Sequence, residues 1–150
     1  MGIKFDGEFS VPVSQDDAYA FLSDPEKFCP CLPTYESLEM EDPKTAHVTI
    51  AIGVGKIRGK AGITLKLEEE QPSTRAAYSG KGKVMGGAFN MVSSFELEPE
   101  DGGTLVKWQG DLSMFGKLVA LAGGLIRPIA KKDIKRMIDA LQAEMGKNAA

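Results

Sequence analysis

The sequence predicts an α+β fold in which a curved antiparallel sheet of seven strands wraps around a long C-terminal helix, with two short helices after the first strand. Apolar and polar residues alternate at the start of the chain and again in six segments between residues 34 and 114, and the period then becomes helical. With 150 residues, 43% of them apolar, we expect one domain over residues 1–150 around a single core.

The first strand is expected over residues 3–11, where apolar residues alternate with charged and polar ones. Ser14 begins a sequence that resembles a capping box, which predicts a short helix from there to about Ser23. A second short helical turn is expected over residues 26–29, and Pro30 predicts an irregular passage after it.

Turn-forming residues separate the six later segments, and these connections are short enough to imply a meander of antiparallel strands. The expected strands are 34–41, 45–54, 57–69, 74–84, 88–98 and 104–114. Beyond Met114, apolar residues recur three and four apart as far as Met145, which predicts the long helix. Gly123, Gly124 and Pro128 predict a kink or a break within it.

Charge and hydropathy exclude several classes of protein. The net charge of −3 gives no basis for binding nucleic acid, although residues 116–150 are basic, with 7 Lys and Arg against 3 Asp and Glu. The N-terminus lacks the apolar run of a signal peptide, and no segment approaches the roughly 20 apolar residues of a spanning helix. We expect a cytoplasmic protein, with peripheral association at the inner membrane face left open.

The inward positions of the predicted strands include very small residues, among them Gly59, Ala61, Gly80 and Gly82. Because protein interiors are close-packed, such residues either bring the helix close or leave a cavity lined by apolar side chains. The alternative is a filled core in which the glycines only bend the strands. The expected ligand-binding residues are Ile57, Ala61, Ile63, Tyr78, Gly82, Val84, Phe89, Met91, Trp108, Leu112, Met114, Leu118, Leu121, Leu125 and Ile129.

Few polar groups are predicted to face this cavity. Tyr78 and Trp108 are expected to orient a ligand, and Asn90 and Ser94 are the other candidates. A bulky residue at Gly82 is expected to weaken ligand binding without unfolding the domain.

Short motifs between about Ile3 and Met145 carry a family resemblance. They are Phe5-Asp6-Gly7-Glu8-Phe9, Ala20-Phe21-Leu22-Ser23-Asp24-Pro25-Glu26, Cys31-Leu32-Pro33, Gly80-Lys81-Gly82, Gly103-Thr104-Leu105-Val106 and Phe115-Gly116-Lys117-Leu118. The order of elements resembles the helix-grip fold of the START (SRPBCC) superfamily, and the motifs resemble its CoxG-like branch, which is named for a carbon monoxide dehydrogenase. Members of that branch usually have glycine where Thr34 stands and often Trp where Tyr19 stands.

The resemblance implies a non-enzymatic accessory protein that binds a hydrophobic, lipid-like or quinone-like molecule, and that in some cases helps recruit or assemble a molybdenum CO dehydrogenase at the membrane. Some members carry a C-terminal hydrophobic anchor, whereas this sequence ends at Ala150, so anchoring by such a segment is not expected. Two alternatives stay open: an enzyme of the polyketide cyclase or aromatase kind that uses the same cavity, and an assembly factor that only docks on a protein.

No catalytic residue, cofactor or metal is expected. His47 is the only histidine, and it is predicted to face solvent beside Thr45 and Thr49 without a partner to orient it. Cys29 and Cys31 lie too close in sequence for a disulfide and lack the further ligands of a zinc site, so we expect them to be small buried residues.

One flank of the long helix is basic. It carries Arg127, Lys131, Lys132, Lys135 and Arg136, which are expected either to face solvent only or to dock on an acidic partner or anionic lipid headgroups. Gly123 and Gly124 beside them could serve as a hinge or as a close packing contact.

Overall fold

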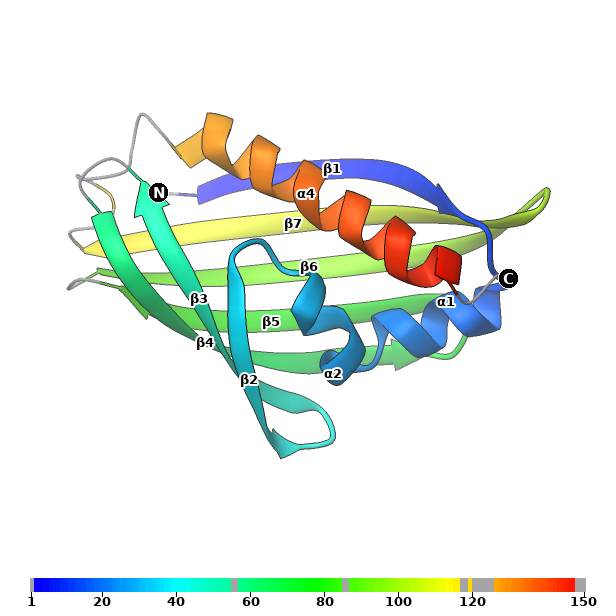
Figure 1. Cartoon of the computed structure of the whole chain (residues 1–150), viewed down its shortest axis with the longest axis horizontal. Coiled ribbons are helices and arrows are strands. Elements are labelled where there is room, and N and C mark those ends of the chain that lie inside the picture. The colour runs from blue at the N-terminus through cyan, green and yellow to red at the C-terminus, as the bar shows by residue number, and fades with distance from the viewer. Residues whose placement is uncertain (1, 55–56, 85–86, 117–118, 120–125, 148–150) are drawn as a thin grey trace.

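The computed structural model consists of one curved, seven-stranded antiparallel sheet with the C-terminal helix α4 lying across it (Figure 1). The elements are β1 (Gly2–Val11), α1 (Gln15–Leu22), α2 (Pro25–Phe28), the 3₁₀ turn η1 (Cys29–Cys31), β2 (Tyr35–Asp42), β3 (Thr45–Val54), β4 (Ile57–Gln71), β5 (Arg75–Val84), β6 (Gly87–Glu100), β7 (Gly103–Gly116) and α4 (Ile126–Lys147). The structure describes residues 2–54, 57–84, 87–116, 119 and 126–147. The predicted fold class is confirmed.

The strands follow the order β1-β7-β6-β5-β4-β3-β2, so the six later strands form the predicted meander and β1 pairs with the last of them. Their observed ends lie within two residues of the expected ones. Register shifts at Tyr35/Ser37 and Met40/Asp42 in β2, and at Leu67/Glu69 in β4, interrupt otherwise regular pairing. Such bulges increase local bend and twist, which helps the sheet to curve.

The two short helices begin as their capping residues predict. The Ser14 hydroxyl accepts a hydrogen bond from the backbone N–H of Asp17 at 3.1 Å, and Asp24 caps α2 by accepting from the N–H of Glu26 at 3.0 Å. The irregular passage expected at Pro30 is instead a 3₁₀ turn, because proline is tolerated in the first turn of a helix, where its missing N–H would have no partner.

The kink or break expected at Gly123, Gly124 and Pro128 stays a prediction, because Gly123 and Gly124 lie outside the described residues. Pro128 is the third residue of α4 as the structure describes it, Ile126–Lys147. Towards its C-terminus, α4 packs against β1 and η1 and buries Leu141 and Met145 completely or almost so.

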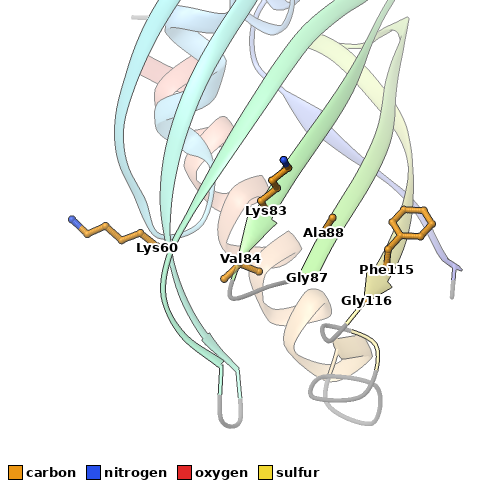
Figure 2. Close-up of a pocket in the computed structure, with 7 residues that line it drawn as sticks. All are labelled: Lys60, Lys83, Val84, Gly87, Ala88, Phe115 and Gly116. Carbon is orange, nitrogen blue, oxygen red and sulfur yellow. The ribbon is translucent and has the colours of Figure 1, made fainter.

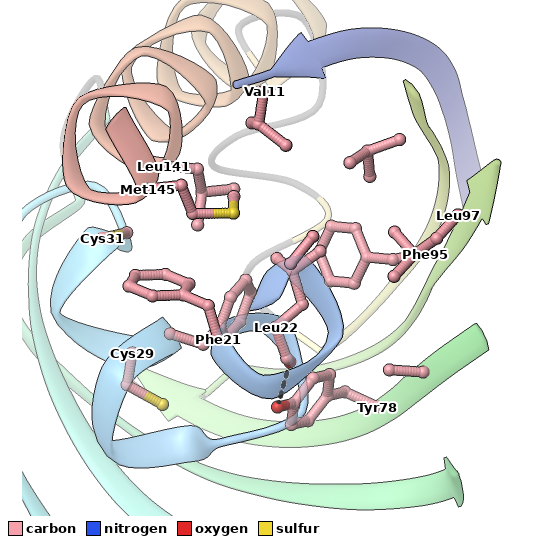
Figure 3. Close-up of a cluster of buried hydrophobic side chains, with 14 of the residues drawn as sticks. Val11, Phe21, Leu22, Cys29, Cys31, Tyr78, Phe95, Leu97, Leu141 and Met145 are labelled. Carbon is pink, nitrogen blue, oxygen red and sulfur yellow. Dashed lines mark hydrogen bonds between the residues drawn. The ribbon is translucent and has the colours of Figure 1, made fainter. Parts of the chain in front are cut away.

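The larger of two hydrophobic clusters joins α1, α2 and the end of α4 to the sheet (Figure 3). Its centre is Tyr78 on β5, whose hydroxyl donates a hydrogen bond to the backbone carbonyl of Leu22 at 2.6 Å. The Tyr78 ring stacks on Phe28 at a centroid distance of 5.1 Å, and Phe28 meets Phe95 edge-on at 5.5 Å. These contacts attach both short helices to the inner face of the sheet.

The second cluster lies on the inner face near the other end of the strands. Its buried members are Ile3, Ala61, Ile63, Val84, Phe89 and Met114. Among the described residues, the partly buried Ile50 packs against both clusters. The interior is therefore built as two centres on one sheet.

Thr34 adopts a backbone conformation that β-branched residues rarely adopt, with φ at 57°. Its hydroxyl donates to the carbonyl of Ala51 at 2.7 Å, and its own carbonyl accepts from the Ala51 N–H at 3.0 Å. Glycine, which the resemblance leads us to expect at this position, adopts this conformation at little cost.

We expect Thr34→Val to lower the free energy of unfolding by about 1 kcal/mol, because valine keeps the left-handed strain and loses the hydroxyl bond. Thr34→Gly relieves the strain as it loses that bond, so its stability should stay within about 1 kcal/mol of the parent. Urea unfolding of the three proteins measures both changes. Equal stability of the valine variant and the parent would show that the Thr34 hydroxyl contributes nothing.

Candidate ligand-binding site

Two inward-facing glycines of β5 are covered by the large residues paired with them on β6. Gly82 pairs with Phe89, and a Cβ atom at Gly82 would lie 2.3 Å from the Phe89 ring. Gly80 pairs with Met91, and its Cβ would lie 2.8 Å from the Met91 Cγ. The small floor predicted from the sequence is filled here, so the expectation for Gly82 is wrong: a bulky residue would collide with Phe89 and destabilise the fold.

Trp108 covers a third glycine in the same way. It pairs with Gly7 of β1, and a Cβ at Gly7 would lie 2.8 Å from the indole Cζ2. The indole therefore lies flat over the β1 backbone. Its Nε1 is buried and has no hydrogen-bond partner in the described part of the chain.

Gly110 is different, because no described side chain fills the space in front of it. It lies on the inner face of β7 between Trp108, which packs against the larger cluster, and Leu112, which packs against the smaller one. A Cβ atom at Gly110 would meet no atom of the described residues within 4 Å. Gly110 pairs with Phe5 on β1 and with Ser93 on β6, so both of these side chains flank the open position.

The inner face around Gly110 is uncharged. The described inward-facing residues of β5, β6 and β7 carry four polar side chains, Tyr78, Ser93, Thr104 and Trp108. The Tyr78 and Thr104 hydroxyls donate to the backbone carbonyls of Leu22 and Val13, at 2.6 and 2.8 Å. Ser93 and Trp108 have no such partner within the described residues.

The structure corrects the expected role or position of three of the predicted polar groups. The Tyr78 hydroxyl is engaged by Leu22, and burial raises its pKa strongly, so it is a structural group and not a ligand anchor. Asn90 is exposed on the outer face, where it pairs with Lys81. Ser94 also points to that face, beside a hollow of about 330 Å³ over β1, β6 and β7. Alternation along β6 places Ser93, which is not among the residues expected from the sequence, on the inside.

The predicted ligand-binding residues fall into separate groups. The smaller cluster brings together Ala61, Ile63, Val84, Phe89 and Met114, with Leu112 packed against it. Tyr78 and Trp108 belong with the larger cluster, and Gly82 and Met91 lie on the paired strands β5 and β6. Leu118, Leu121 and Leu125 lie outside the described residues, as do the side chains of Ile57 and Ile129. Gly110 is absent from the expected set, although the same period-two pattern places it on the inner face.

Comparison with known proteins identifies the family to which this chain belongs. A model of the CoxG family, described as the G subunit of carbon monoxide dehydrogenase, matches residues 7–146. The chain belongs to the CoxG family. No curated protein matches it.

Solved structures share the fold of this CoxG-family protein. A conserved protein from Geobacillus kaustophilus superposes with a TM-score of 0.84 at 20% identity, covering 97% of this chain and 96% of that one. A START superfamily protein from Mycobacterium smegmatis gives 0.70 at 12% identity, covering 96% and 97%. The di-domain ARO/CYC StfQ of the steffimycin biosynthetic pathway gives 0.65 at 12% identity, covering 99% of this chain and 52% of that one.

A hollow of about 450 Å³ lies on the outer face of the CoxG-family sheet, at the end of β4 to β7 (Figure 2). Its lining residues are Lys60, Lys83, Val84, Gly87, Ala88, Phe115 and Gly116. Phe115 is 47% exposed there, and Lys60 is paired with Glu36 at 2.9 Å. In Figure 2 the side chains of Lys60 and Lys83 point apart, so they do not converge on one small molecule.

His47 is exposed, as expected; its Nε2 lies 3.2 Å from Glu41 Oε1, and its Nδ1 lies 3.2 Å from Thr64 Oγ1. Thr45, expected on the same exposed face, is buried. The described residues contain no group of three His, Cys, Asp or Glu side chains that could hold a metal ion. Within the described part of the chain, no helix is both long and apolar enough to cross a membrane.

The basic flank of α4 is exposed at Lys131, Lys132, Lys135 and Arg136. Its ion pairs are long and lie within the helix, Lys135 with Asp139 at 3.7 Å and Arg136 with Asp133 at 3.9 Å. Exposed pairs of this kind contribute little to stability. The side chain of Arg127 lies outside the described ones.

Cys29 and Cys31 are buried free thiols, as predicted. Burial, with the neighbouring Cys31 and Asp24, raises the pKa of Cys29 to about 12. Burial, with Glu144, raises the pKa of Cys31 to about 11. Both thiols are therefore protonated and unreactive at neutral pH.

These raised pKa values predict a loss of stability in alkali. An unfolded thiol titrates near pH 8.5, so the unfolded chain releases protons that the folded chain retains. The free energy of unfolding should be unaffected below that pH and should fall as the pH rises towards 11 or 12. Urea unfolding at about pH 8 and pH 10 measures the decline, which should be smaller in Cys29→Ala/Cys31→Ala. An equal decline in both proteins would contradict this origin.

Proposed function

We propose that this CoxG-family protein binds a hydrophobic small molecule, lipid-like or quinone-like, between its sheet and α4. The observation that supports it most directly is the open position at Gly110, on an uncharged inner face between two separate apolar clusters. Close-packed interiors leave few such openings, and one lined by apolar side chains gains contacts when an apolar molecule enters.

The side chains around the opening are suited to that role. Phe5, Met91 and Leu112 face inwards yet remain partly exposed. A ligand lying over Gly110 would remove their exposed area from water, at roughly 25 cal/mol per Å² of apolar surface. Binding of this kind discriminates between ligands by their size and shape.

A binding role without catalysis is favoured by the arrangement of polar groups. Cyclase-type chemistry needs acids or bases that converge on the substrate. On the described inner faces of β5 to β7, Tyr78 and Thr104 are bound to the backbone, and Ser93 and Trp108 carry no charge. The similarity to StfQ concerns the fold, and fold alone does not transfer an activity.

The finer proposal is that the protein serves as an accessory factor of a molybdenum CO dehydrogenase, as the name of its family suggests. The exposed basic flank of α4 would dock on an acidic surface of that enzyme, because Lys131 and Lys132 form no ion pair within the described residues and Lys135 and Arg136 form only long ones. An anionic membrane surface at the inner face is the other docking partner that this charge could serve.

Gly110→Val should weaken binding of hydrophobic ligands at least about tenfold, because its three added carbons occupy space that the ligand would fill. Valine fits a strand, and no atom of the described ranges obstructs the Cβ position, so the variant should fold. Native mass spectrometry, with a lipid extract and defined quinones as probes, measures the retained ligand.

Gly62→Val is the matched control. Gly62 is exposed on the outer face of β4, and a Cβ there also meets no described atom within 4 Å. This variant should bind as the parent does. If both variants bind equally well, the ligand does not occupy the space at Gly110.

Charge reversal separates docking from ligand binding. Lys131→Glu/Lys135→Glu should lower affinity for a purified molybdenum CO dehydrogenase about tenfold or more and leave ligand binding unchanged, because complementary charge is lost at the docking surface alone. Biolayer interferometry at two salt concentrations measures the effect. Lys81→Glu/Lys83→Glu, the same charge change on the outer face of β5, is the control. Equal loss in both variants would indicate a response to net charge only.

A further inference from the structure

The hollow of about 330 Å³ over β1, β6 and β7 lies on the outer face of the sheet, opposite the face that α4 covers. We call it the outer hollow. The strand register places its polar lining residues in two rows across the sheet, Asp6, Gln109 and Ser94 in one and Glu8, Lys107 and Glu96 in the other. Three carboxylates and one cation thus border the same space.

The cations at the outer hollow already have carboxylate partners. The Nζ of Lys107, the one positively charged residue in the described lining, lies 2.9 Å from Glu98. Arg75, which neighbours Glu96 on β5, binds Glu96 at 2.8 Å and Glu69 at 2.7 Å. Neither cation is left over to neutralise the carboxylates on β1.

Asp6 and Glu8 are those carboxylates. Both are exposed, and neither forms an ion pair with the residues that the structure describes. A hydrogen bond with Glu98 raises the pKa of Lys107, and the nearby charges of Glu8 and Glu96 add to the rise. Negative charge therefore exceeds positive charge at the outer hollow, which favours a cationic group there.

Ser94 supplies a polar group that is buried beside the outer hollow. It is 9% exposed, and its hydroxyl forms no hydrogen bond with the described part of the chain. Buried polar groups in native proteins are nearly always paired, so the Ser94 hydroxyl indicates a partner that enters the hollow from outside. The amide of Gln109, next to it in the row, likewise has no hydrogen bond within the described ranges.

The kinds of acceptor determine which cation fits. Charged carboxylates and neutral oxygens from neighbouring strands border the outer hollow together. The guanidinium group of arginine has five N–H donors in one plane and can serve both kinds at once, whereas the ammonium group of lysine is a compact point charge. The described carboxylates do not form a group that could hold a metal ion.

The surface beside the outer hollow is acidic as well. Glu98, Glu100 and Asp101 are exposed where β6 turns into β7. This acidic surface suits a peptide segment with several positive charges, whereas a small guanidinium compound would occupy the hollow alone.

We infer that the outer hollow binds an arginine side chain from a basic segment of a partner protein. Asp6 and Glu8 balance the charge of the guanidinium group, and Ser94 and Gln109 accept hydrogen bonds from it. The site and Gly110 lie on opposite faces of the sheet, so this inference is independent of the proposed function.

Three probes test the inference: a hexapeptide of alternating arginine and glycine, its lysine counterpart, and N-acetylarginine amide. NMR titration of the isotopically labelled protein measures affinity and locates the contact. The parent should bind the arginine peptide about fivefold or more tightly than the lysine peptide. Asp6→Asn/Glu8→Gln should weaken the arginine peptide about tenfold, and Ser94→Ala should weaken it about threefold and narrow the preference for arginine.

Glu26→Gln/Glu39→Gln is the matched control. It removes two exposed carboxylates that form no ion pair within the described residues, on α2 and on β2 at the other edge of the sheet. This variant should bind the arginine peptide as the parent does. An equal loss in both double variants, or equal binding of the two peptides by the parent, would overturn the inference.

The remaining outcomes concern the occupant. N-acetylarginine amide that binds as tightly as the peptide would make the site one for a small molecule and overturn the choice of a protein segment. Sedimentation of the parent alone tests a second copy of this chain: self-association that Asp6→Asn/Glu8→Gln abolishes would assign the outer hollow to that copy and overturn the inference. Absence of binding by the parent would overturn it too.

Discussion

The register between β1, β7, β6 and β5 is the constraint on which the rest of the interior depends. It sets Gly82 opposite Phe89, Gly80 opposite Met91 and Gly7 opposite Trp108, so that each large side chain lies over a residue with none. The same register sets Gly110 opposite Phe5 and Ser93, and within the part of the chain that the structure describes no side chain covers it. A shift by one residue would turn every one of these side chains to the opposite face.

As a result, the buried contacts at the two ends of the sheet come from different elements. At one end, the Tyr78 hydrogen bond to Leu22 and the aromatic contacts of Phe28 fasten the short helices to the strands, and Leu141 and Met145 add the end of α4 (Figure 3). At the other end, strand residues alone supply the fully buried part of the described cluster. The proposed ligand position at Gly110 therefore lies between an end of the sheet that the helices cover and an end built from strand residues.

Most of the fold could be predicted from the sequence, because period-two alternation and turn residues define the strands without reference to their partners. Residue positions in the site are harder to predict. Whether a glycine leaves space depends on which residue the register places opposite it, and for this reason the sequence favours Gly82 as the open position over Gly110. The partner of Tyr78 is a backbone carbonyl 56 positions away, which no local pattern reveals, so its hydroxyl looks free for a ligand.

The position of β1 also bears on how the chain folds. The strands β2 to β7 pair with sequence neighbours through short turns, whereas β1 pairs with β7, as Gly7 does with Trp108 about a hundred residues later. Closing so long a loop costs more entropy than forming a hairpin, so the meander is expected to assemble first and β1 to join it afterwards. Phe5, and Trp108 over Gly7, which border the proposed site, therefore reach their places late, when the N-terminal strand pairs with β7.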